Sequence, residues 1–432
     1  MNGAALLAVT LAGLQACLAT GGRMEEVLSW KQLDFQFPTA GAREAAIASG
    51  DFVAANNGPQ GLAVWRDKLF VTVPRWKSGV PSTLNYVNIT HAYPDLATNT
   101  LPGEIGGPKD GTLPHKIVSV YRVRVDVCDR LWVIDSGRTD TKDDASRVRA
   151  PAKLLVYDLR TDKLLRQYAF KAGDVKEDSF FANVVVDTTP QTCDDAYAYV
   201  PDLGGFGVVV YSWRHNASWR VKHHFFHFDP LSGSFNVEGI DYRSTDGVFS
   251  IALSPVQGDG YRSAYFHALS STHEFLVSTR VLQNKTIAEL PESYYAYKVL
   301  GSRGPNTQAS ASDLDEKTGV LFYTQINRNG LGCWNSISKA EDYGPDTNAL
   351  IASDNVTMAY ESDVKVDADG NVWMLSNRLA AFLERGLDKN EVNFRVFKAN
   401  VGDLIKGSVC DVLPAQSAAG LQPPTKRNSP NS

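Results

Sequence analysis

The chain carries one recurring pattern, in which a short apolar or alternating run is interrupted by a polar turn and followed by another such run. Six segments share it; they are residues 61–72, 123–134, 184–187 with 195–200, 239–250, 313–324 and 363–374. Asp-Gly at 246–247 and 369–370 and Lys-Thr-Gly at 317–319 supply residues that hairpin turns favour. Extended helical periodicity is scarce, so the pattern predicts an all-β protein.

Each segment places an aromatic residue at the equivalent position after its turn: Phe70, Trp132, Tyr199, Phe249, Phe322 and Trp373. Successive members lie about 61 residues apart on average, the length of one propeller blade with long loops. A four-stranded blade cannot bury both faces alone, so consecutive blades must stack around a common axis. Six repeats therefore predict a six-bladed β-propeller.

The two ends of the repeat region suggest how such a ring closes. Residues 29–37 and 393–398 both alternate polar and apolar residues, as half-buried strands do. We expect the first segment to complete the blade that contains the second, so that an N-terminal strand closes the propeller.

The chain has 432 residues, enough for one large domain or for two or three smaller ones, and the repeats favour a single propeller domain over residues 23–416. Residues 4–19 form an apolar run followed by small residues, so we assign residues 1–22 to a secretory signal peptide. The alternative, a membrane anchor, usually needs about 20 apolar residues. Residues 417–432 are polar and contain Pro-Pro and Ser-Pro, which predicts a disordered tail.

Charge and composition limit the classes of partner that the chain is expected to bind. The formal net charge is −5, and Lys426-Arg427 in the tail is the one basic run, so the sequence indicates neither a nucleic-acid partner nor a membrane partner. A small molecule or another protein fits better, and the sequence leaves the oligomeric state open.

If the chain is secreted, its cysteines can form disulfides and its four glycosylation motifs can be acceptors. Four cysteines remain after removal of the signal, and they allow two disulfides in three connectivities: Cys128, Cys193, Cys333 and Cys410. Four Asn-x-Ser/Thr sequons are acceptors if the chain enters a glycosylating pathway; they begin at Asn88, Asn216, Asn284 and Asn355.

Several longer motifs lie at residues 59–65, 70–75 with 79–85, 121–126 with 128–137, 333–335 and 372–379. Together they resemble the motifs of the Yellow/major royal jelly protein family. The chain departs from the family where Ala92-Tyr-Pro-Asp95 stands in place of the usual Pro-Tyr-Pro-type segment. The resemblance implies a secreted, insect-type protein on a six-bladed propeller. It also implies a role among those associated with the family: cuticle pigmentation and melanin formation, dopachrome conversion, binding of biogenic amines, or nutrition.

The repeat suggests how the cysteines pair. Cys128 lies in the turn of the second unit, and Cys193 lies in the equivalent, longer turn of the third. Because equivalent turns of neighbouring blades should be close, we predict a Cys128–Cys193 disulfide, which leaves Cys333 with Cys410. Closing such long loops contributes about 2–4 kcal/mol. A nucleophilic Cys128 is disfavoured, since a reactive thiolate needs a nearby base or cation and no partnering thiol.

The first strand of each blade runs beside the central channel, so its opening residues can converge at the channel mouth. Four residues before the turn-entry position of each unit stand Gln60, Arg122, Asn183, Glu238, Ala311 and Asp363. All except Ala311 are polar. We therefore predict that a ligand channel is lined by Gln60, Arg122, Asn183, Glu238 and Asp363.

This ring has the chemistry to hold an aromatic amine. Glu238 and Asp363 can pair with a cation, Gln60 and Asn183 offer hydrogen bonds, and nearby aromatic residues can stack on a ring. Two alternatives stay open. In one, Arg122, Glu238 and Asp363 neutralise one another in a solvated channel; in the other, the same oxygens bind calcium.

Two other motifs resemble metal sites. If His223-His-Phe-Phe-His227 is a strand, residues 223 and 227 share a face while 224 points away, which predicts an edge strand with surface histidines. Asp367-Ala-Asp-Gly-Asn371 lacks the spacing of a calcium loop and is predicted to be a hairpin turn. We therefore predict no resident metal or cofactor.

Three functions are compatible with these observations. We favour a secreted pigmentation-pathway protein that binds a biogenic amine or catechol-derived aromatic in its channel. The second is a dopachrome-converting tautomerase in which Glu238 or Asp363, with Arg122, moves a proton and stabilises charge. The third is a structural or nutritive extracellular protein of cuticle, eggshell or royal-jelly type. A fold does not fix function, so the sequence alone does not separate them.

Overall fold

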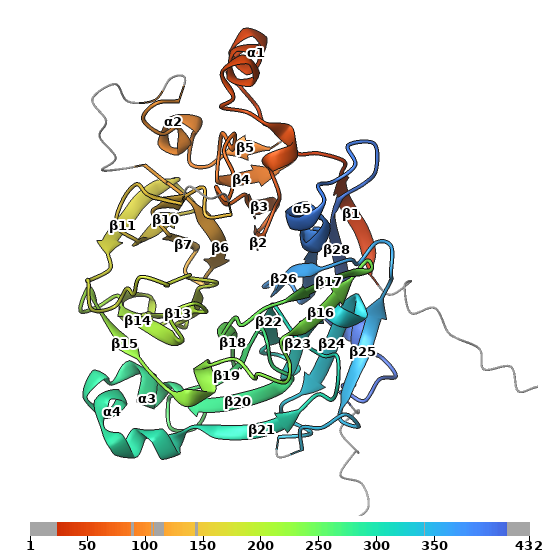
Figure 1. The fold of residues 1–432 in the computed structure, drawn as a ribbon. Coiled ribbons are helices and arrows are strands. Elements are labelled where there is room, and N and C mark those ends of the chain that lie inside the picture. Colours follow the sequence, from red (N-terminus) through yellow and green to blue (C-terminus); the bar gives the residue numbers. More distant parts are fainter. Residues whose placement is uncertain are drawn as a thin grey trace, which may run out of the picture.

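The structure is a computed structural model that describes residues 24–87, 90–104, 107, 116–142, 146–340 and 342–412. The predicted signal peptide, the predicted tail and the sequon at Asn88 lie outside these residues. Six four-stranded antiparallel sheets stand around a common axis (Figure 1). The all-β, six-bladed propeller predicted from the repeats is therefore confirmed.

Successive blades follow the chain, and the first strand of each is the innermost one (Figure 1). Blade 1 contains β2 (Gly61–Trp65), β3 (Lys68–Thr72), β4 (Leu84–Val87) and β5 (His91–Ala92). Blade 2 contains β6 (Val120–Val125), β7 (Arg130–Asp135), β10 (Lys153–Asp158) and β11 (Lys163–Ala169). Blade 3 contains β12 (Val185–Asp187), β13 (Tyr197–Asp202), β14 (Gly207–Ser212) and β15 (Ala217–Val221).

The second half of the ring repeats this arrangement. Blade 4 contains β18 (Val248–Leu253), β19 (Ser263–Ala268), β20 (His273–Ser278) and β21 (Lys298–Ser302). Blade 5 contains β22 (Ser312–Asp315), β23 (Val320–Gln325), β24 (Gly330–Asn335) and β25 (Asn348–Ser353). Blade 6 contains β26 (Glu361–Val366), β27 (Asn371–Ser376), β28 (Phe394–Asn400) and the N-terminal β1 (Glu25–Trp30).

The N-terminal strand closes the ring as predicted, because β1 pairs antiparallel with β28 in blade 6. The strand ends at Trp30, however, and does not run over residues 29–37. Beyond it, Phe35 and Phe37 pack on Phe52, with ring centroids 5.7 and 5.8 Å away. The alternation after Trp30 therefore serves a small aromatic cluster and not a strand ladder.

The repeated turn has a common chemical basis. In blade 2, the Asp126 carboxylate accepts hydrogen bonds from Trp132 Nε1 and from Arg130 Nε, both at 2.7 Å. In blade 6, Asp367 accepts one from Trp373 Nε1 at 2.7 Å. Because buried polar groups need partners, each aspartate fixes the tryptophan of the second strand against the turn. The segment at 367–371 is thus a hairpin turn, as the sequence indicated.

The structure contains both expected disulfides. Cys128–Cys193 joins the first turn of blade 2 to that of blade 3, with 5.9 Å between the Cα atoms. Cys333–Cys410 joins β24 to the chain after α6 (Val401–Ile405), with 6.2 Å between the Cα atoms. Each bond therefore connects segments that are distant in sequence.

Three of the four sequon asparagines fall within the described residues, and all three are exposed: Asn216, Asn284 and Asn355. Exposure is the structural requirement for an acceptor. Their glycosylation stays a prediction.

Blade 4 departs from the predicted repeat. Its first strand is β18, so Phe249 lies on the first strand and not after the first turn. The preceding residues form a separate hairpin of β16 (Ser234–Val237) and β17 (Ile240–Arg243). Its two-residue turn is Glu238-Gly239, with φ values of 52° and 76°, a conformation that glycine accepts without strain. Asp-Gly at 246–247 therefore precedes the blade and does not form its first turn.

The remaining elements lie in the connections. The α-helices are α1 (Ala40–Ser49), α2 (Leu96–Asn99), α3 (Thr279–Gln283), α4 (Lys285–Glu289) and α5 (Leu379–Glu384), besides α6. Short 3₁₀ helices are η2 (Ala54–Asn56), η3 (Cys193–Asp195), η4 (His224–Phe226), η5 (Pro291–Ala296) and η6 (Ile326–Arg328). A small hairpin pairs β8 (Arg138–Thr139) with β9 (Arg147–Val148). Across the described residues, none of the helices has both the length and the apolar character that a bilayer crossing requires.

Candidate functional site

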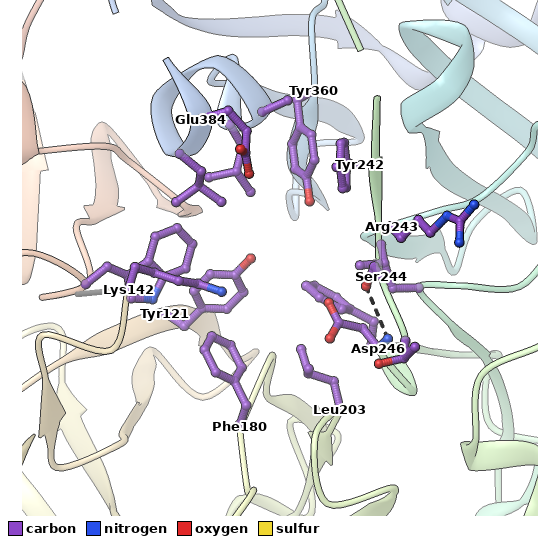
Figure 2. A pocket seen from close by; sticks show the side chains of 17 residues that line it. Tyr121, Lys142, Phe180, Leu203, Tyr242, Arg243, Ser244, Asp246, Tyr360 and Glu384 are labelled. Carbon is purple, nitrogen blue, oxygen red and sulfur yellow. Dashed lines mark hydrogen bonds between the residues drawn. The ribbon is translucent and has the colours of Figure 1, made fainter. Parts of the chain in front are cut away.

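A cavity of about 390 Å³ occupies the mouth of the central channel, where the inner strands begin. Figure 2 shows the side chains arranged around its open centre. Its aromatic lining residues are Trp76, Tyr121, Phe180, Tyr242, Phe249 and Tyr360, and its charged ones are Lys142, Arg243, Asp246 and Glu384. A concave space of this volume, with apolar walls and few charged groups, has the character of a small-molecule site.

Tyr121, near the start of β6, is the centre of the aromatic wall. Its ring centroid lies 5.5 Å from that of Trp76, 5.3 Å from that of Phe180 and 6.0 Å from that of Phe249. Burial raises the pKa of the Tyr121 hydroxyl to about 12, so the group is protonated at neutral pH and can donate a hydrogen bond. The rings hold one another and form a rigid surface for a flat ligand.

The inserted hairpin lies across the cavity from Tyr121, and α5 lies on a further side of the cavity, beside Tyr360 (Figure 2). Tyr242 on β17 stacks on Phe235 of β16, with 5.0 Å between the ring centroids and 10° between the planes. Leu379 and Ala380 of α5 add buried apolar surface. The insertion that breaks the repeat in blade 4 thus builds part of the cavity.

Asp246 places a carboxylate at the cavity, in the short connection between β17 and β18 (Figure 2). Its backbone N–H donates to Ser244 Oγ at 3.2 Å, which fixes the loop. Burial raises the pKa of Asp246, while hydrogen bonding with Ser244 and the charge of Lys142 act in the opposite direction. A raised pKa means that the ionised carboxylate is disfavoured while it is unpaired. A cation beside Asp246 would stabilise the ionised form.

Beneath the cavity, Arg122 closes the channel. Its side chain is wholly buried, Nη1 donates to Ser310 O at 2.9 Å, and Nη2 donates to Ser362 O. Its Nε lies 3.7 Å from Asp363 Oδ1, and its guanidinium lies 4.7 Å from the ring centroid of Phe249. Arg122 therefore ties the inner strand of blade 2 to those of blades 5 and 6.

The layer continues through two carboxylates that connect neighbouring inner strands. Asp363 Oδ1 accepts from Lys365 Nζ at 2.6 Å, and its Oδ2 accepts from the Leu62 backbone N–H at 3.0 Å. Asp313 Oδ2 accepts from Arg124 Nη1 at 2.6 Å and from the Val366 backbone N–H at 2.8 Å. We call these five charged side chains the ionic layer: Arg122, Arg124, Asp313, Asp363 and Lys365.

The structure brings together only two of the five residues predicted to bind a ligand. Arg122 and Asp363 meet in the ionic layer, and neither lines the cavity. Gln60 and Asn183 are buried near the starts of their blades and also lie outside the lining; the Asn183 amide oxygen accepts from the Val184 backbone N–H at 2.9 Å. The predicted ring is therefore not the surface that a ligand in this cavity would contact.

The assignment of Glu238 to an inner strand is wrong. Glu238 lies in the β16–β17 turn, where its carboxylate pairs with Arg378 at 2.7 Å. The connection between β17 and β18 contains Asp246-Gly247, the residues expected of a first blade turn, so the repeat was aligned on β17 and β18 and not on the first two strands of the blade. The predicted catalytic set of Glu238, Asp363 and Arg122 is consequently not assembled at one accessible place, nor do the oxygens proposed for calcium converge there.

Sequence reasoning missed Tyr121, Phe180, Asp246 and Tyr360. A signal for three of them was present, because Tyr121, Phe180 and Tyr360 each stand one to three residues before a predicted ring residue. Asp246 carried no such signal, since it was taken as a turn residue.

Among the residues that the structure describes, no group of three or more His, Cys, Asp or Glu side chains is arranged to hold a metal ion.

Fold and site together define a six-bladed propeller with an aromatic, carboxylate-bearing cavity at one mouth and a closed channel beneath it. A family model described as "Major royal jelly protein" matches residues 118–410. "Protein yellow" of Drosophila erecta is 37% identical over 447 residues, covering 98% of this chain and 80% of that protein. "Protein yellow" of Drosophila pseudoobscura pseudoobscura is 39% identical over 401 residues, covering 90% and 69%. The chain belongs to the Yellow/major royal jelly protein family.

One solved structure, a PQQ-bound aldose sugar dehydrogenase from Streptomyces coelicolor, covers 79% of this chain and 94% of its own at 10% identity and a TM-score of 0.42. A likeness this low carries no argument about function.

Proposed function

We propose that this protein is a secreted binding protein of the pigmentation pathway that holds a biogenic amine, or another catechol-derived aromatic, in the mouth cavity. The observation that carries the proposal is the carboxylate of Asp246, which faces a cavity with aromatic walls. The pathway is proposed from the family to which the chain belongs. The ligand contacts are those of the cavity and replace the five residues expected from the sequence.

The cavity suits a flat ring that carries a cation. An ammonium group would pair with Asp246, and because the carboxylate is partly withdrawn from water, that charge-assisted bond is stronger than one at the surface. The ring would pack on Tyr121 and Phe180, where a cation also gains from the faces of aromatic rings. The tyrosine hydroxyls offer hydrogen bonds to catechol oxygens.

Secretion is part of the proposal and rests on separate features. Disulfides persist mainly in oxidising compartments, and the chain forms two of them. Exposed sequons and an apolar N-terminal run of signal length support the same location.

Isothermal titration calorimetry with dopamine, serotonin and dopachrome tests the proposal. We expect dopamine to bind the wild type and to bind Asp246→Asn at least about tenfold more weakly, since a charged hydrogen bond is worth about 1.5–3 kcal/mol. Asp369→Asn, at an exposed turn carboxylate of blade 6, is the matched control and should leave the affinity unchanged. Equal heats for wild type and Asp246→Asn would reject the assignment, and no heat with any of the three ligands would favour a structural or nutritive protein.

The raised pKa of Asp246 also favours a second candidate function, dopachrome tautomerisation. Asp246 would take the proton that leaves a ring-system carbon of the substrate, and a tyrosine hydroxyl or a water molecule would return one to the developing phenolate oxygen. The reaction is an isomerisation and needs no oxidant or reductant. Decay of the dopachrome absorbance should then be faster with wild type than with Asp246→Asn; equal rates for wild type, variant and buffer would exclude this activity.

A further inference from the structure

The histidine motif at 223–227 lies outside the mouth cavity and does not form the edge strand predicted for it. It contains the 3₁₀ helix η4. His223 is buried, its Nδ1 accepts from the Phe225 backbone N–H at 3.0 Å, and its ring stacks on Tyr297 with 4.0 Å between the centroids. His224 and His227, by contrast, are both exposed on one cavity of about 300 Å³. The sequence had paired 223 with 227 and turned 224 away.

This second cavity collects positive charge. Its lining residues are Lys176, Phe206, Lys222, His223, His224, His227 and Tyr294, and no carboxylate is among them. Four separate segments supply these residues: the connection from β11 to β12, the β13–β14 turn, the chain after β15, and η5. Lys176 Nζ donates to Gly205 O at 2.6 Å, so its ammonium group is held at the site.

The charged groups packed around the cavity do not cancel that charge. Two carboxylates act on Lys176, those of Asp202 and Asp178. Asp202 is buried and pairs with Arg220 at 2.7 Å, and Asp178 is exposed and lies outside the cavity lining. Burial lowers the pKa of Lys176, and Arg220 and Lys222 lower it further. Burial also lowers the pKa of His227, with His224 and Lys176 acting in the same direction. His223 stays neutral, because burial lowers its pKa to about 4.

We propose that this cavity is a binding site for a phosphate or sulfate group, either as the free oxyanion or as an aryl ester. Lys176 and Lys222 supply the positive charge, and the ring N–H groups of His224 and His227 donate hydrogen bonds to the oxygens. Phe206 stacks on His227 with 4.6 Å between centroids and 21° between planes, which offers an aromatic face to the ester's ring. The positive charges of the two lysines would repel a metal cation from this cavity.

The site is separate from the mouth cavity, and its pH dependence follows from His227. An oxyanion beside His227 favours the protonated ring, so a ligand whose own charge stays constant should bind more tightly as the pH falls. Calorimetric titration with inorganic sulfate and with phenyl sulfate, which stay ionised throughout, at pH 5.5 and pH 7.5 tests this. We expect at least about fivefold tighter binding at the lower pH for the wild type, the effect of about 1 kcal/mol of added attraction.

Variants locate the effect. The double variant His224→Gln/His227→Gln should lose the pH dependence of binding. Lys222→Gln should weaken binding at both pH values. His215→Gln, at an exposed histidine on the β14–β15 turn, is the control and should match the wild type. Tighter binding of phenyl sulfate than of inorganic sulfate would identify an aryl ester as the ligand form, and equal affinities would identify the free oxyanion. Absence of binding at pH 5.5, or equal affinity for wild type and the double variant, would overturn the proposal. Dopamine titrations of the same preparations report on the mouth cavity separately.

Discussion

The mouth cavity and the ionic layer are built from neighbouring residues of the same inner strands, yet their chemistry is opposite. On β6, Tyr121 faces the cavity and Arg122 belongs to the layer; around the start of β26, Tyr360 and Asp363 divide in the same way. Every charge of the layer has a partner within 3.7 Å. The cavity leaves Asp246 partly buried with a raised pKa. Residues that close the ring and residues that line the cavity are therefore only one to three positions apart along the chain.

The difference follows from the cost of burying charge. A charge removed from water must be paired and hydrogen-bonded, and the layer meets this condition with backbone groups as well as side chains. Where a site must receive a ligand, part of the pairing has to be left to the ligand. Polar residues beside a propeller channel are therefore not ligand contacts by default.

The largest expected effect comes from breaking the layer. Asp363→Ala removes the partner of Lys365 and Arg122 and the acceptor of the Leu62 N–H, leaving buried cations uncompensated. We expect the free energy of unfolding to fall by about 3–5 kcal/mol, measured by urea denaturation.

Asp369→Ala, at an exposed carboxylate on the same sheet, is the control and should stay within about 0.5 kcal/mol of the wild type. A loss below 1 kcal/mol in Asp363→Ala would contradict the role given to the layer.

Phe249 belongs to both regions, so its truncation should affect both. Phe249 lines the cavity, and the Arg122 guanidinium lies 4.7 Å from its ring centroid. Phe249→Leu should lower the free energy of unfolding by about 1–2 kcal/mol through lost packing and cation–π attraction, and should also weaken dopamine binding. Denaturation and calorimetry on one preparation measure the two effects.

Tyr295→Leu removes an exposed ring in η5 and should change neither quantity. If Phe249→Leu altered stability alone, the ring would belong to the layer and not to the binding surface.

A smaller effect is expected at the rim of the cavity. Lys142 is exposed, lies 5.9 Å from the Trp76 ring centroid and acts against a cationic ligand. Lys142→Gln should tighten dopamine binding about two- to fivefold, equivalent to less than about 1 kcal/mol at an exposed site. The gain should shrink in high salt, because surface electrostatics are screened. Lys298→Gln on β21 is the control, and weaker binding in Lys142→Gln would show that the ligand is not a cation.

The same comparison explains how far the sequence could be interpreted. Alternation and the aspartate-to-tryptophan turn are local properties, so they revealed the propeller, the turns at Asp126 and Asp367 and the neighbouring cysteines. The cavity depends on an inserted hairpin and on α5, which follow no repeat. The Asp246-Gly247 connection between β17 and β18 resembled a blade turn, and this misplaced Glu238. Nothing in a periodic pattern shows which of two adjacent residues, Tyr121 or Arg122, faces the opening.

The smallest expected effect is a pH dependence of stability that originates in the cavity. Because the folded-state pKa of Asp246 is raised above its unfolded value, the protonated carboxyl stabilises the fold, and this contribution is present at low pH and lost as the pH rises through the folded pKa. Asp246→Asn lacks this titration. The free energy of unfolding of the wild type, relative to that variant, should therefore decline as the pH rises from the unfolded-state pKa of about 4 through the raised folded-state pKa, by less than about 1 kcal/mol for a partly buried group. Urea denaturation of both proteins across this pH range isolates the contribution of Asp246, because all other carboxylates are common to the two.

Saturating dopamine should reverse the slope of this pH dependence, since a bound cation favours the ionised carboxylate. A wild type that gains stability over the variant as the pH rises, with no ligand present, would contradict the environment assigned to Asp246.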